Sequence, residues 1–157
     1  MSFRITGLDA TPFRRFYGLP DEQLARLNVR RYVVDAKPGF PDRVEMRDLE
    51  RGESALLFNF EHQPAPTPYR ATHAIFVLEW AEQRFDAIDR VPDVLRSRAI
   101  SLRAFNGIGE MVDADLVDGR EIEPVIERLL AGPQTAYLHA HYAKRGCYAG
   151  RIDKVSS

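Results

Sequence analysis

Hydrophobic and polar residues alternate along the centre of the chain in a way that predicts two neighbouring β-strands. From Leu56 to Phe60 every second side chain is large and apolar, and this period of two is typical of a strand with one buried face. In residues 73–80 both faces are apolar, which is typical of a strand with neighbours on both sides. We therefore expect a strand pair here, with the second strand in a central position.

The C-terminal third shows the clearest helix pattern, with strand patterns before and after it. The helix has an apolar stripe at helical spacing and ends at Gly132-Pro133. The stripe consists of Ile122, Val125, Ile126, Leu129 and Leu130. Two strands precede the helix and two follow it, at about residues 100–104, 112–116, 135–142 and 147–153. This β-β-α-β-β order predicts an α+β fold, a mostly antiparallel sheet with a few short helices.

The first third of the chain predicts shorter elements. Thr11-Pro12 is typical of a helix start, because a hydroxyl caps the first turn and proline suits its first position. The acidic residues after Pro20 predict a second short helix. The proline-rich residues 64–68 are expected to form a rigid loop outside any sheet. Strands are expected at residues 3–8, 30–35 and 43–47.

Composition narrows the class of protein without identifying a function. A chain of 157 residues, 45% of them hydrophobic, matches one domain, which we place over residues 1–157. It has 22 basic and 23 acidic residues and a formal charge of -1, so its overall field favours neither nucleic acid nor a membrane surface. A single cysteine, Cys147, and an N-terminus without a long apolar run predict a soluble cytoplasmic protein.

The four histidines fall at suggestive places in the predicted strands. His62 ends one strand and His73 opens the next, while His139 and His141 lie two apart on a third strand. Alternation places His139 and His141 on one face, together with Tyr137. The histidines are therefore the first candidates for a site.

The pairing of the last two strands decides what faces these histidines. If Lys144-Arg145 forms the turn, Tyr142 pairs with Cys147 and His139 lies opposite Gly150. Glycine there would leave open space beside the imidazole. In this register Cys147 points away from the histidines, and we interpret it as a buried structural thiol.

Three interpretations of His139 and His141 remain open. They can belong to a solvated sheet face, where each histidine only satisfies its hydrogen bonds. They can join Arg70, Arg145 or Arg151 in a pocket for a carboxylate or phosphate. They can also chelate a metal, with His62 or His73 as a third ligand. Because no acidic ligand follows at a recognisable spacing, we predict neither a metal site nor a cofactor.

The strand at 112–116 offers a weaker candidate. Val112, Ala114 and Leu116 are expected to face inward, which places Asp113 and Asp115 together on the outer face. Paired carboxylates can divide acid and base roles, but on an edge strand they usually form a solvated face. We therefore leave them outside the predicted site.

Several segments with a distinctive sequence follow one another along essentially the whole chain. They are DAKPGFP (35–41), EHQP (61–64), TPYRATHAIFV (67–77), SLRAF (101–105), MVDAD (111–115), YLHAH (137–141) and RGC (145–147). Together they resemble the bacterial family called Domain of Unknown Function 1203. The resemblance implies a single-domain bacterial protein and no established activity. In that family a cysteine often stands where this chain has Asp42, and this difference argues against a redox or metal pair with Cys147.

The leading hypothesis is a small-molecule binding domain for an anionic metabolite, with or without catalysis. A rigid loop that ends in Tyr69-Arg70, between histidines at strand ends, motivates it. The predicted pocket is lined by His62, Tyr69, Arg70, His73, His139 and His141. Arg70 is expected to clamp the anion and Tyr69 to form a wall. The alternative is a non-catalytic protein-interaction module, a homodimer formed through an exposed sheet edge.

Overall fold

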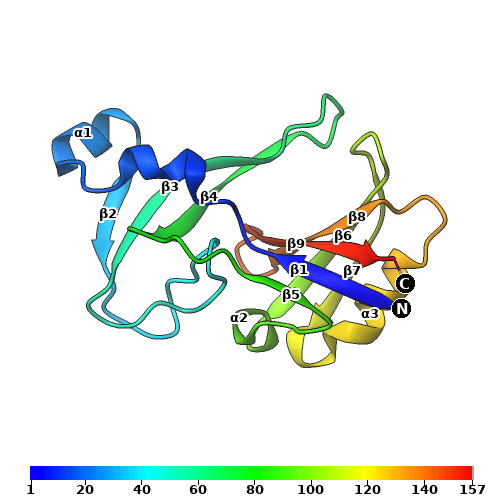
Figure 1. The fold of residues 1–157 in the computed structure, drawn as a ribbon. Helices are drawn as coiled ribbons and strands as arrows, with labels where there is room; N and C mark the ends of the chain where they lie inside the picture. The colour runs from blue at the N-terminus through cyan, green and yellow to red at the C-terminus, as the bar shows by residue number, and fades with distance from the viewer. Residues whose placement is uncertain (157) are drawn as a thin grey trace.

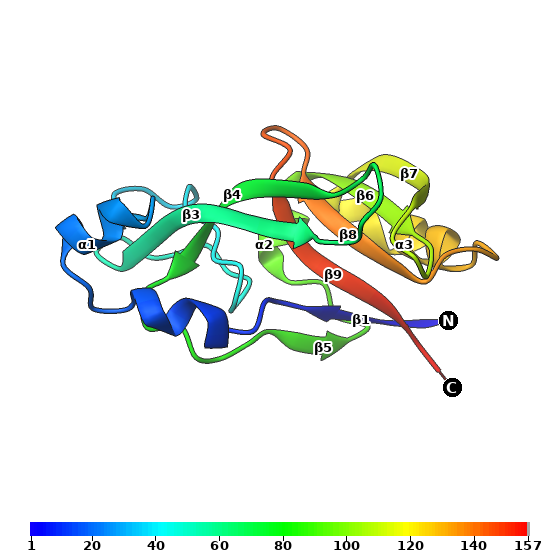
Figure 2. The same ribbon diagram turned by 90° about the horizontal axis from the view of Figure 1, so that it is seen from above.

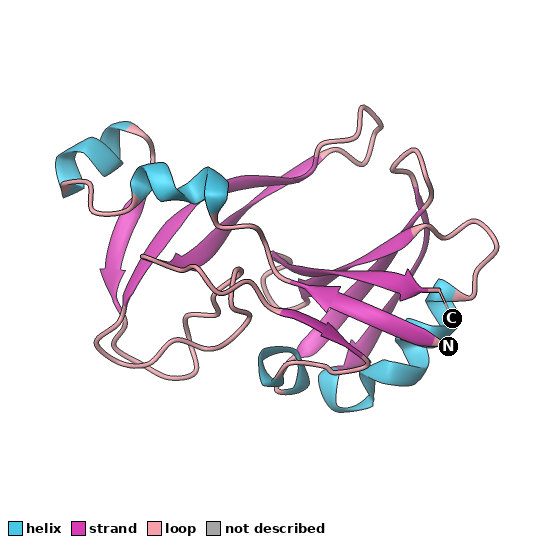
Figure 3. Ribbon diagram, viewed as in Figure 1, coloured by secondary structure: helices cyan, strands magenta, loops and turns pink. Residues whose placement is uncertain are grey.

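Two antiparallel sheets surrounded by short helices make up the computed structural model, which describes residues 1–156 (Figures 1 and 3). The six-stranded sheet contains, in spatial order, β5 (Asp86–Ile88), β1 (Ser2–Thr6), β9 (Tyr148–Val155), β8 (Tyr137–Tyr142), β6 (Ala99–Phe105) and β7 (Met111–Asp118). The three-stranded sheet contains β2 (Arg30–Val33), β3 (Ser54–Gln63) and β4 (Ala71–Leu78). The predicted α+β class, mostly sheet with short helices, is confirmed.

Helices pack on both sheets. They are the 3-10 helices η1 (Thr11–Phe16) and η2 (Gly119–Glu121) and the α-helices α1 (Asp21–Arg26), α2 (Asp93–Arg96) and α3 (Ile122–Leu130). Among residues 1–156, no helix is long and apolar enough to cross a membrane.

The core of the six-stranded sheet lies under α3, as the C-terminal pattern predicts. Ile122, Ile126 and Leu129 of the helix are buried against Leu102 and Leu138 of the sheet. Pro124 is the third residue of α3, where a missing N–H costs no intrahelical hydrogen bond. The order β6-β7-α3-β8-β9 is therefore the predicted unit, and burial of the apolar stripe stabilises it.

The three-stranded sheet has its own core beneath η1. The ring centroids of Phe13 and Phe16 lie 5.0 and 5.2 Å from that of Phe58 on β3. Leu24 of α1 is buried in the same core. The aromatic residues near the N-terminus therefore serve as core residues.

The β3–β4 hairpin joins the two sheets. Its strands β3 and β4 are both longer than β2. The far end of the hairpin therefore extends beyond the smaller sheet and crosses over β8 and β9 of the six-stranded sheet (Figure 2). There the rings of Phe60 and His62 pack on Tyr148, with centroids 6.2 and 5.2 Å apart. The hairpin packs on the sheet face opposite α3, since Leu138 and Ala140, which alternate with His139, belong to the helix-side core.

The strand predicted at 43–47 is wrong. This segment makes only isolated bridges at its edges, Pro41 to Asp48 and Asp42 to Phe76. Its backbone groups make single hydrogen bonds to separate parts of the chain and no continuous ladder: Arg43 donates to Phe76 of β4 and accepts from Leu8, and Val44 accepts from Phe85. The carboxylate of the preceding Asp42 accepts hydrogen bonds from the backbone N–H groups of Leu78 and Glu45, at 2.7 and 2.5 Å.

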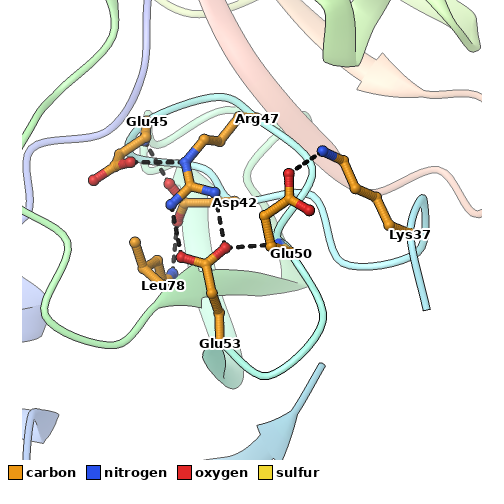
Figure 4. Close-up of polar contacts among 7 residues, drawn as sticks. All are labelled: Lys37, Asp42, Glu45, Arg47, Glu50, Glu53 and Leu78. Carbon is orange, nitrogen blue, oxygen red and sulfur yellow. Dashed lines mark hydrogen bonds and ion pairs between the residues drawn. The ribbon is translucent and has the colours of Figure 1, made fainter. Parts of the chain in front are cut away.

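An ion-pair network holds the loop between β2 and β3 in place (Figure 4). Arg47 donates two hydrogen bonds of 2.8 Å to Glu53 and one of 2.9 Å to Glu45. Glu53 also accepts from the backbone N–H of Glu50, at 2.7 Å, and Glu50 pairs with Lys37. These pairs replace the sheet ladder that residues 43–47 lack.

The inward face predicted for β7 is also wrong in part. Leu116 is 67% exposed and Ala114 is exposed, whereas Val112 and Val117 pack against the core. The pairing of β6 with β7 shifts between Ala104 and Phe105, and a bulge of this kind breaks strict alternation.

Candidate functional site: a histidine cluster and its pocket

Strand pairing places two rows of polar residues on the face of the six-stranded sheet opposite α3. His139 on β8 lies between Arg103 of β6 and Arg151 of β9. His141 lies between Ser101 and Tyr148. Because directly paired residues point to the same face of a sheet, each histidine has polar or aromatic neighbours on both sides.

The predicted register of β8 and β9 is wrong by one residue at His139. Gly150 pairs with Ala140, and the register shifts between Ala140 and His141. The expected link between Tyr142 and Cys147 is present as a backbone hydrogen bond of 2.9 Å. The bulge that follows it therefore places Arg151, and not open space, opposite His139.

The structure brings the four histidines together where the hairpin crosses the sheet. The Nε2 atom of His62 lies 2.7 Å from Nδ1 of His73, and the two rings are stacked. The ring centroid of His62 lies 4.9 Å from that of His141 and 6.1 Å from that of His139. Residues far apart in the sequence thus form one cluster, with Tyr148 stacked on His62.

Three ring nitrogens of this cluster are buried and make no hydrogen bond within residues 1–156. They are Nδ1 of His62, Nδ1 of His139 and Nε2 of His141. His139 is 4% exposed and His141 is fully buried. The Nδ1 atom of His141 lies 2.9 Å from the carbonyl oxygen of Gly146. Buried polar atoms are nearly always paired, so three unpaired nitrogens in one cluster are an unusual feature.

Burial keeps the imidazoles neutral. It lowers the pKa of His62 to about 4 and the pKa values of His139 and His141 to about 3. Burial is also the main cause that lowers the pKa of His73. The Arg103 guanidinium adds to each of these shifts, because a nearby positive charge opposes protonation. At neutral pH the positive charge beside the cluster is therefore carried by arginine and not by the histidines.

Arg103 itself has no acidic partner in the part of the chain that the structure describes. It is half-buried, and burial lowers its pKa. Its hydrogen bond is a long one, 3.3 Å from Nε to Oγ of Ser101. Arg151 differs, because it donates to Asp153 at 2.9 and 3.0 Å and lies over the ring of Tyr137.

A pocket of about 340 Å³ opens beside the cluster. Its walls come from the end of β3, the β3–β4 loop, the β6–β7 loop and the strands β8 and β9. It is lined by His62, Gln63, Pro64, Ala65, Gly107, Ile108, Gly109, Tyr137, His139 and Arg151. Gln63 donates a hydrogen bond of 3.0 Å to the Tyr137 hydroxyl, and Thr67 donates one of 3.2 Å to the Gly109 carbonyl. The first bond joins the strands β3 and β8, and the second joins the β3–β4 and β6–β7 loops.

Of the six residues predicted from the sequence, His62 and His139 line the pocket, whereas Tyr69, Arg70, His73 and His141 do not. Arg70 is paired with Glu61 at 2.8 Å, and its side chain is 62% exposed. Tyr69 is also exposed, at the end of the proline-rich loop. His73 contacts the cluster through His62 without lining the pocket.

The sequence analysis missed Arg103, Gln63 and Tyr148. Arg103 alternates with the buried Leu102 and Ala104, so its strand face was readable from the sequence. Its place beside His139 requires the pairing of β6 with β8, for which single-strand alternation gives no signal. Tyr148 faces the cluster because of the register shift that follows the correctly predicted turn of the last hairpin.

The remaining candidates lie away from the cluster. Asp113 and Asp115 are exposed on the edge strand β7, and Asp115 pairs with Arg128. Cys147 is only partly buried, and its Sγ accepts a hydrogen bond of 3.1 Å from Nη2 of the buried Arg43.

The amino-acid sequence of the chain matches one known protein family. The family model described as "Protein of unknown function (DUF1203)" matches residues 39–154. The chain belongs to the DUF1203 family. The match includes β3, β4 and β6–β9, and with them all four histidines and the whole pocket. No curated protein and no solved structure matches the chain. The resemblance seen in the sequence is confirmed, and the function must be argued from the site.

Proposed function

We propose that this DUF1203 protein is a bacterial cytoplasmic domain that binds a small anionic molecule beside the histidine cluster. The observation that carries the proposal is Arg103, a half-buried guanidinium without an acidic partner in residues 1–156. Burying a charge without a counter-ion costs free energy. A bound carboxylate or phosphate would supply that counter-ion.

The neighbouring groups suit a small ligand. The pocket volume of about 340 Å³ lies near the lower end of the roughly 300–1,000 Å³ usual for ligand sites. His139, between Arg103 and Arg151 in the sheet, connects the cationic row to the pocket. Gln63 and Tyr137, which also line the pocket, offer uncharged hydrogen-bonding groups. These features support a ligand the size of a small organic acid or phosphate.

The electrostatics favour binding over proton transfer. Imidazoles with pKa values of about 3 to 4 are weak bases at neutral pH, and efficient general bases have a pKa near the working pH. The histidines therefore act as neutral hydrogen-bonding groups. We propose a binding role for the protein and assign no reaction to it.

A thermal-shift screen against small carboxylates and phosphates tests the proposal. A ligand at a hundred times its Kd stabilises the folded protein by about 2.7 kcal/mol, so a binding anion raises the unfolding temperature visibly. For the anion found, we expect calorimetric titration of Arg103→Gln to show affinity at least about tenfold weaker, because hydrogen bonds to charged groups contribute about 1.5–3 kcal/mol. Arg70→Gln is the matched control, because Arg70 is exposed and already paired with Glu61.

Three results would contradict the proposal. One is the absence of any stabilising anion in the panel. The second is an anion that binds Arg103→Gln as tightly as the wild type. The third is a loss of affinity on Arg70→Gln but not on Arg103→Gln, which would move the site to the exposed loop.

A second candidate function is a non-catalytic homodimer formed through a sheet edge. The observation in its favour is the edge strand β7, where Leu116 is 67% exposed. Exposed acidic residues flank it, however, and charges on an edge strand oppose edge-to-edge pairing. A concentration-dependent dimer in sedimentation, lost on Leu116→Lys, would support this candidate. A monomer at all concentrations would exclude it.

A further inference from the structure

The unpaired nitrogens of the histidine cluster point to a second kind of ligand. Nδ1 of His62, Nδ1 of His139 and Nε2 of His141 are buried without a hydrogen-bond partner in residues 1–156. One ring nitrogen from each of these histidines lies within 4.8 Å of the other two. A solvated face would pair such atoms with water, but these atoms are shielded from solvent.

Outer hydrogen bonds orient two of the three rings. In neutral His141, the Nδ1–H donates to the Gly146 carbonyl at 2.9 Å, which leaves a lone pair on Nε2. In the tautomer of His62 whose Nε2–H donates to Nδ1 of His73, the lone pair is on Nδ1. A histidine that binds a metal through one nitrogen usually donates its other N–H to such a partner.

From this geometry we infer that His62, His139 and His141 form a binding site for one divalent transition-metal ion of the Zn²⁺ type. Imidazole ligands suit Zn²⁺, Co²⁺, Ni²⁺ and Cu²⁺, whereas Mg²⁺ and Ca²⁺ require oxygen ligands. A nitrogen bound to zinc lies about 2.0–2.1 Å from the ion. From a mutual spacing within 4.8 Å, the rings need to approach a common centre by less than about 1 Å to reach that distance.

The place of the site in the fold explains what the ion would do. His62 comes from β3 of the smaller sheet, while His139 and His141 come from β8 of the larger one, so the ion would link the two. Three neutral ligands leave the double charge of the ion uncompensated, and a three-histidine site leaves a fourth position open. Because His62 and His139 also line the pocket, an anionic ligand can complete the coordination there. The metal site goes beyond the proposed function and does not depend on it.

Metal titration of the full chain, freed of metal by a chelator, tests the inference. We expect Zn²⁺ to bind in calorimetry with one ion per chain, and Co²⁺ to give the intense visible absorption of four-coordinate cobalt. His139→Gln and His141→Gln should lose more than the roughly 10–100-fold in affinity expected for removal of an outer partner. Arg70→Gln, at an exposed residue outside the pocket lining, should keep the wild-type affinity.

His73 is the positioning residue in this account, and its variants have a distinct signature. His73→Leu removes the acceptor for His62 and should weaken Zn²⁺ binding about 10–100-fold. In His73→Gln the side-chain oxygen can accept the same N–H, so this variant should recover most of the affinity. Equal affinities for His73→Leu and the wild type would contradict the assigned tautomer and the positioning role.

A cysteine substitution keeps the test decisive if a glutamine variant fails to fold. His139→Cys retains a metal ligand, and a cobalt complex with this variant should gain a sulfur-to-metal charge-transfer band absent from the wild type. The inference is overturned if folded wild-type protein binds neither Zn²⁺ nor Co²⁺. It is also overturned if metal binding is unchanged in His139→Gln and His141→Gln, or if the cobalt spectrum of His139→Cys lacks the new band.

Measurements on one preparation of the protein distinguish a failure of the metal site from a failure of the proposed function. Anion affinity is measured once on the chelated chain and once on the Zn²⁺-loaded chain. Anion binding to a chain that takes up no metal overturns the metal site and leaves the proposed function standing. Metal uptake without any anion binding confirms the metal site and overturns the proposed function.

Discussion

Glu79 shows how this chain normally treats a buried charge. It accepts hydrogen bonds from Arg31 at 2.8 and 2.9 Å, from the backbone N–H of Gly18 at 2.8 Å and from the hydroxyl of Ser54 at 2.8 Å. Arg31 is the main cause that lowers the pKa of Glu79 to about 2. With every lone pair used, this carboxylate contrasts with the unpaired groups of the histidine cluster.

Replacement of Glu79 by glutamine should reduce both stability and its dependence on pH. The folded-state pKa of about 2 lies below the ordinary 4.5, so the carboxylate stabilises the fold above pH 4.5 and loses this effect as the pH falls towards 2. We expect Glu79→Gln to lower the free energy of unfolding at pH 7 by about 2–3 kcal/mol. Urea unfolding between pH 7 and pH 2 measures both effects.

Glu82→Gln is the control for that prediction. Glu82 pairs with Arg14, but both side chains are more than half exposed, and such surface pairs contribute about 0–1 kcal/mol. If Glu79→Gln cost no more than Glu82→Gln, or left the slope of stability between pH 5 and pH 2 unchanged, the assigned role of Glu79 would be wrong.

At the residue scale, the sequence predicts which face of a strand a side chain occupies better than it predicts which residues lie beside it. Alternation correctly gives His139, His141 and Tyr137 a common face, since period two is a local property of one strand. It cannot reveal Arg103, because the contact between Arg103 and His139 depends on which strand pairs with β8. Arg70 was expected to bind the anion, but it is paired with Glu61 across the hairpin, and alternation does not reveal this partner either.

At the scale of elements, the contact between the β3–β4 and β6–β7 loops shapes the pocket. Gly109 has a φ of +87°, and a Cβ at this position would overlap the Cβ of Ala65. Gly107, two residues earlier in the same loop and also in the pocket wall, has open space around it. The two glycines therefore form a matched pair for substitution.

Gly109→Ala should push the two loops apart, while Gly107→Ala should leave them in place. We expect Gly109→Ala to cost about 1–3 kcal/mol of stability through the overlap and the left-handed backbone, and to weaken anion binding. Gly107→Ala should stay within about 0.5 kcal/mol. Thermal unfolding and anion titration of both variants give the comparison, and equal behaviour of the two would show that the loop contact does not shape the pocket.

The accuracy of the sequence analysis for each element follows from how local its pattern is. Helix α3 and the strands β3 and β4 are located correctly because their apolar periodicity lies within one segment. The central position expected for the second strand is wrong, because β4 is an edge strand and β3 lies between β2 and β4. Residues 43–47 resemble a strand, but the backbone groups of Arg43 and Val44 bond singly to Leu8, Phe76 and Phe85 and form no ladder. The bulges in β7 and β9 shift faces through pairing with a neighbour, and single-strand periodicity contains no signal for them.

At the scale of the whole molecule, buried polar contacts tie the two sheets together. Arg43, in the loop between β2 and β3, is 1% exposed and donates to the carbonyl oxygen of Tyr148 on β9 at 2.9 Å. It also donates to the carbonyl oxygen of Pro41 at 2.5 Å. A separation of the sheets would leave this guanidinium buried and unpaired or expose the surrounding core, and both outcomes cost free energy.

If residues 1–157 form a single domain, as the sequence predicts, the whole chain should unfold in one step. Trp80, the only tryptophan, packs on Tyr17 beside the smaller sheet, so its fluorescence reports on that part of the molecule. Far-UV circular dichroism reports on both sheets. We expect the two signals to give one coincident urea transition, and two separated midpoints would show two independent units.

The site was only partly predictable because it lies where the two sheets meet. The sequence identifies the four histidines and the rigid loop, which are local features. The crossing of the hairpin over β8 and β9 (Figure 2) is a property of how the sheets pack. It places Arg103, and not Arg70, beside the histidines without an acidic partner among residues 1–156.

The most direct test of anion binding at the histidine cluster is a nuclear magnetic resonance titration of the imidazole nitrogens. The chain has four histidines, so their signals can be assigned by one substitution each. On addition of small carboxylates and phosphates, the account predicts saturable shifts for His62 and His139 that are lost in Arg103→Gln. Histidine signals that stay unchanged across the panel, or shift equally in Arg103→Gln, would contradict it.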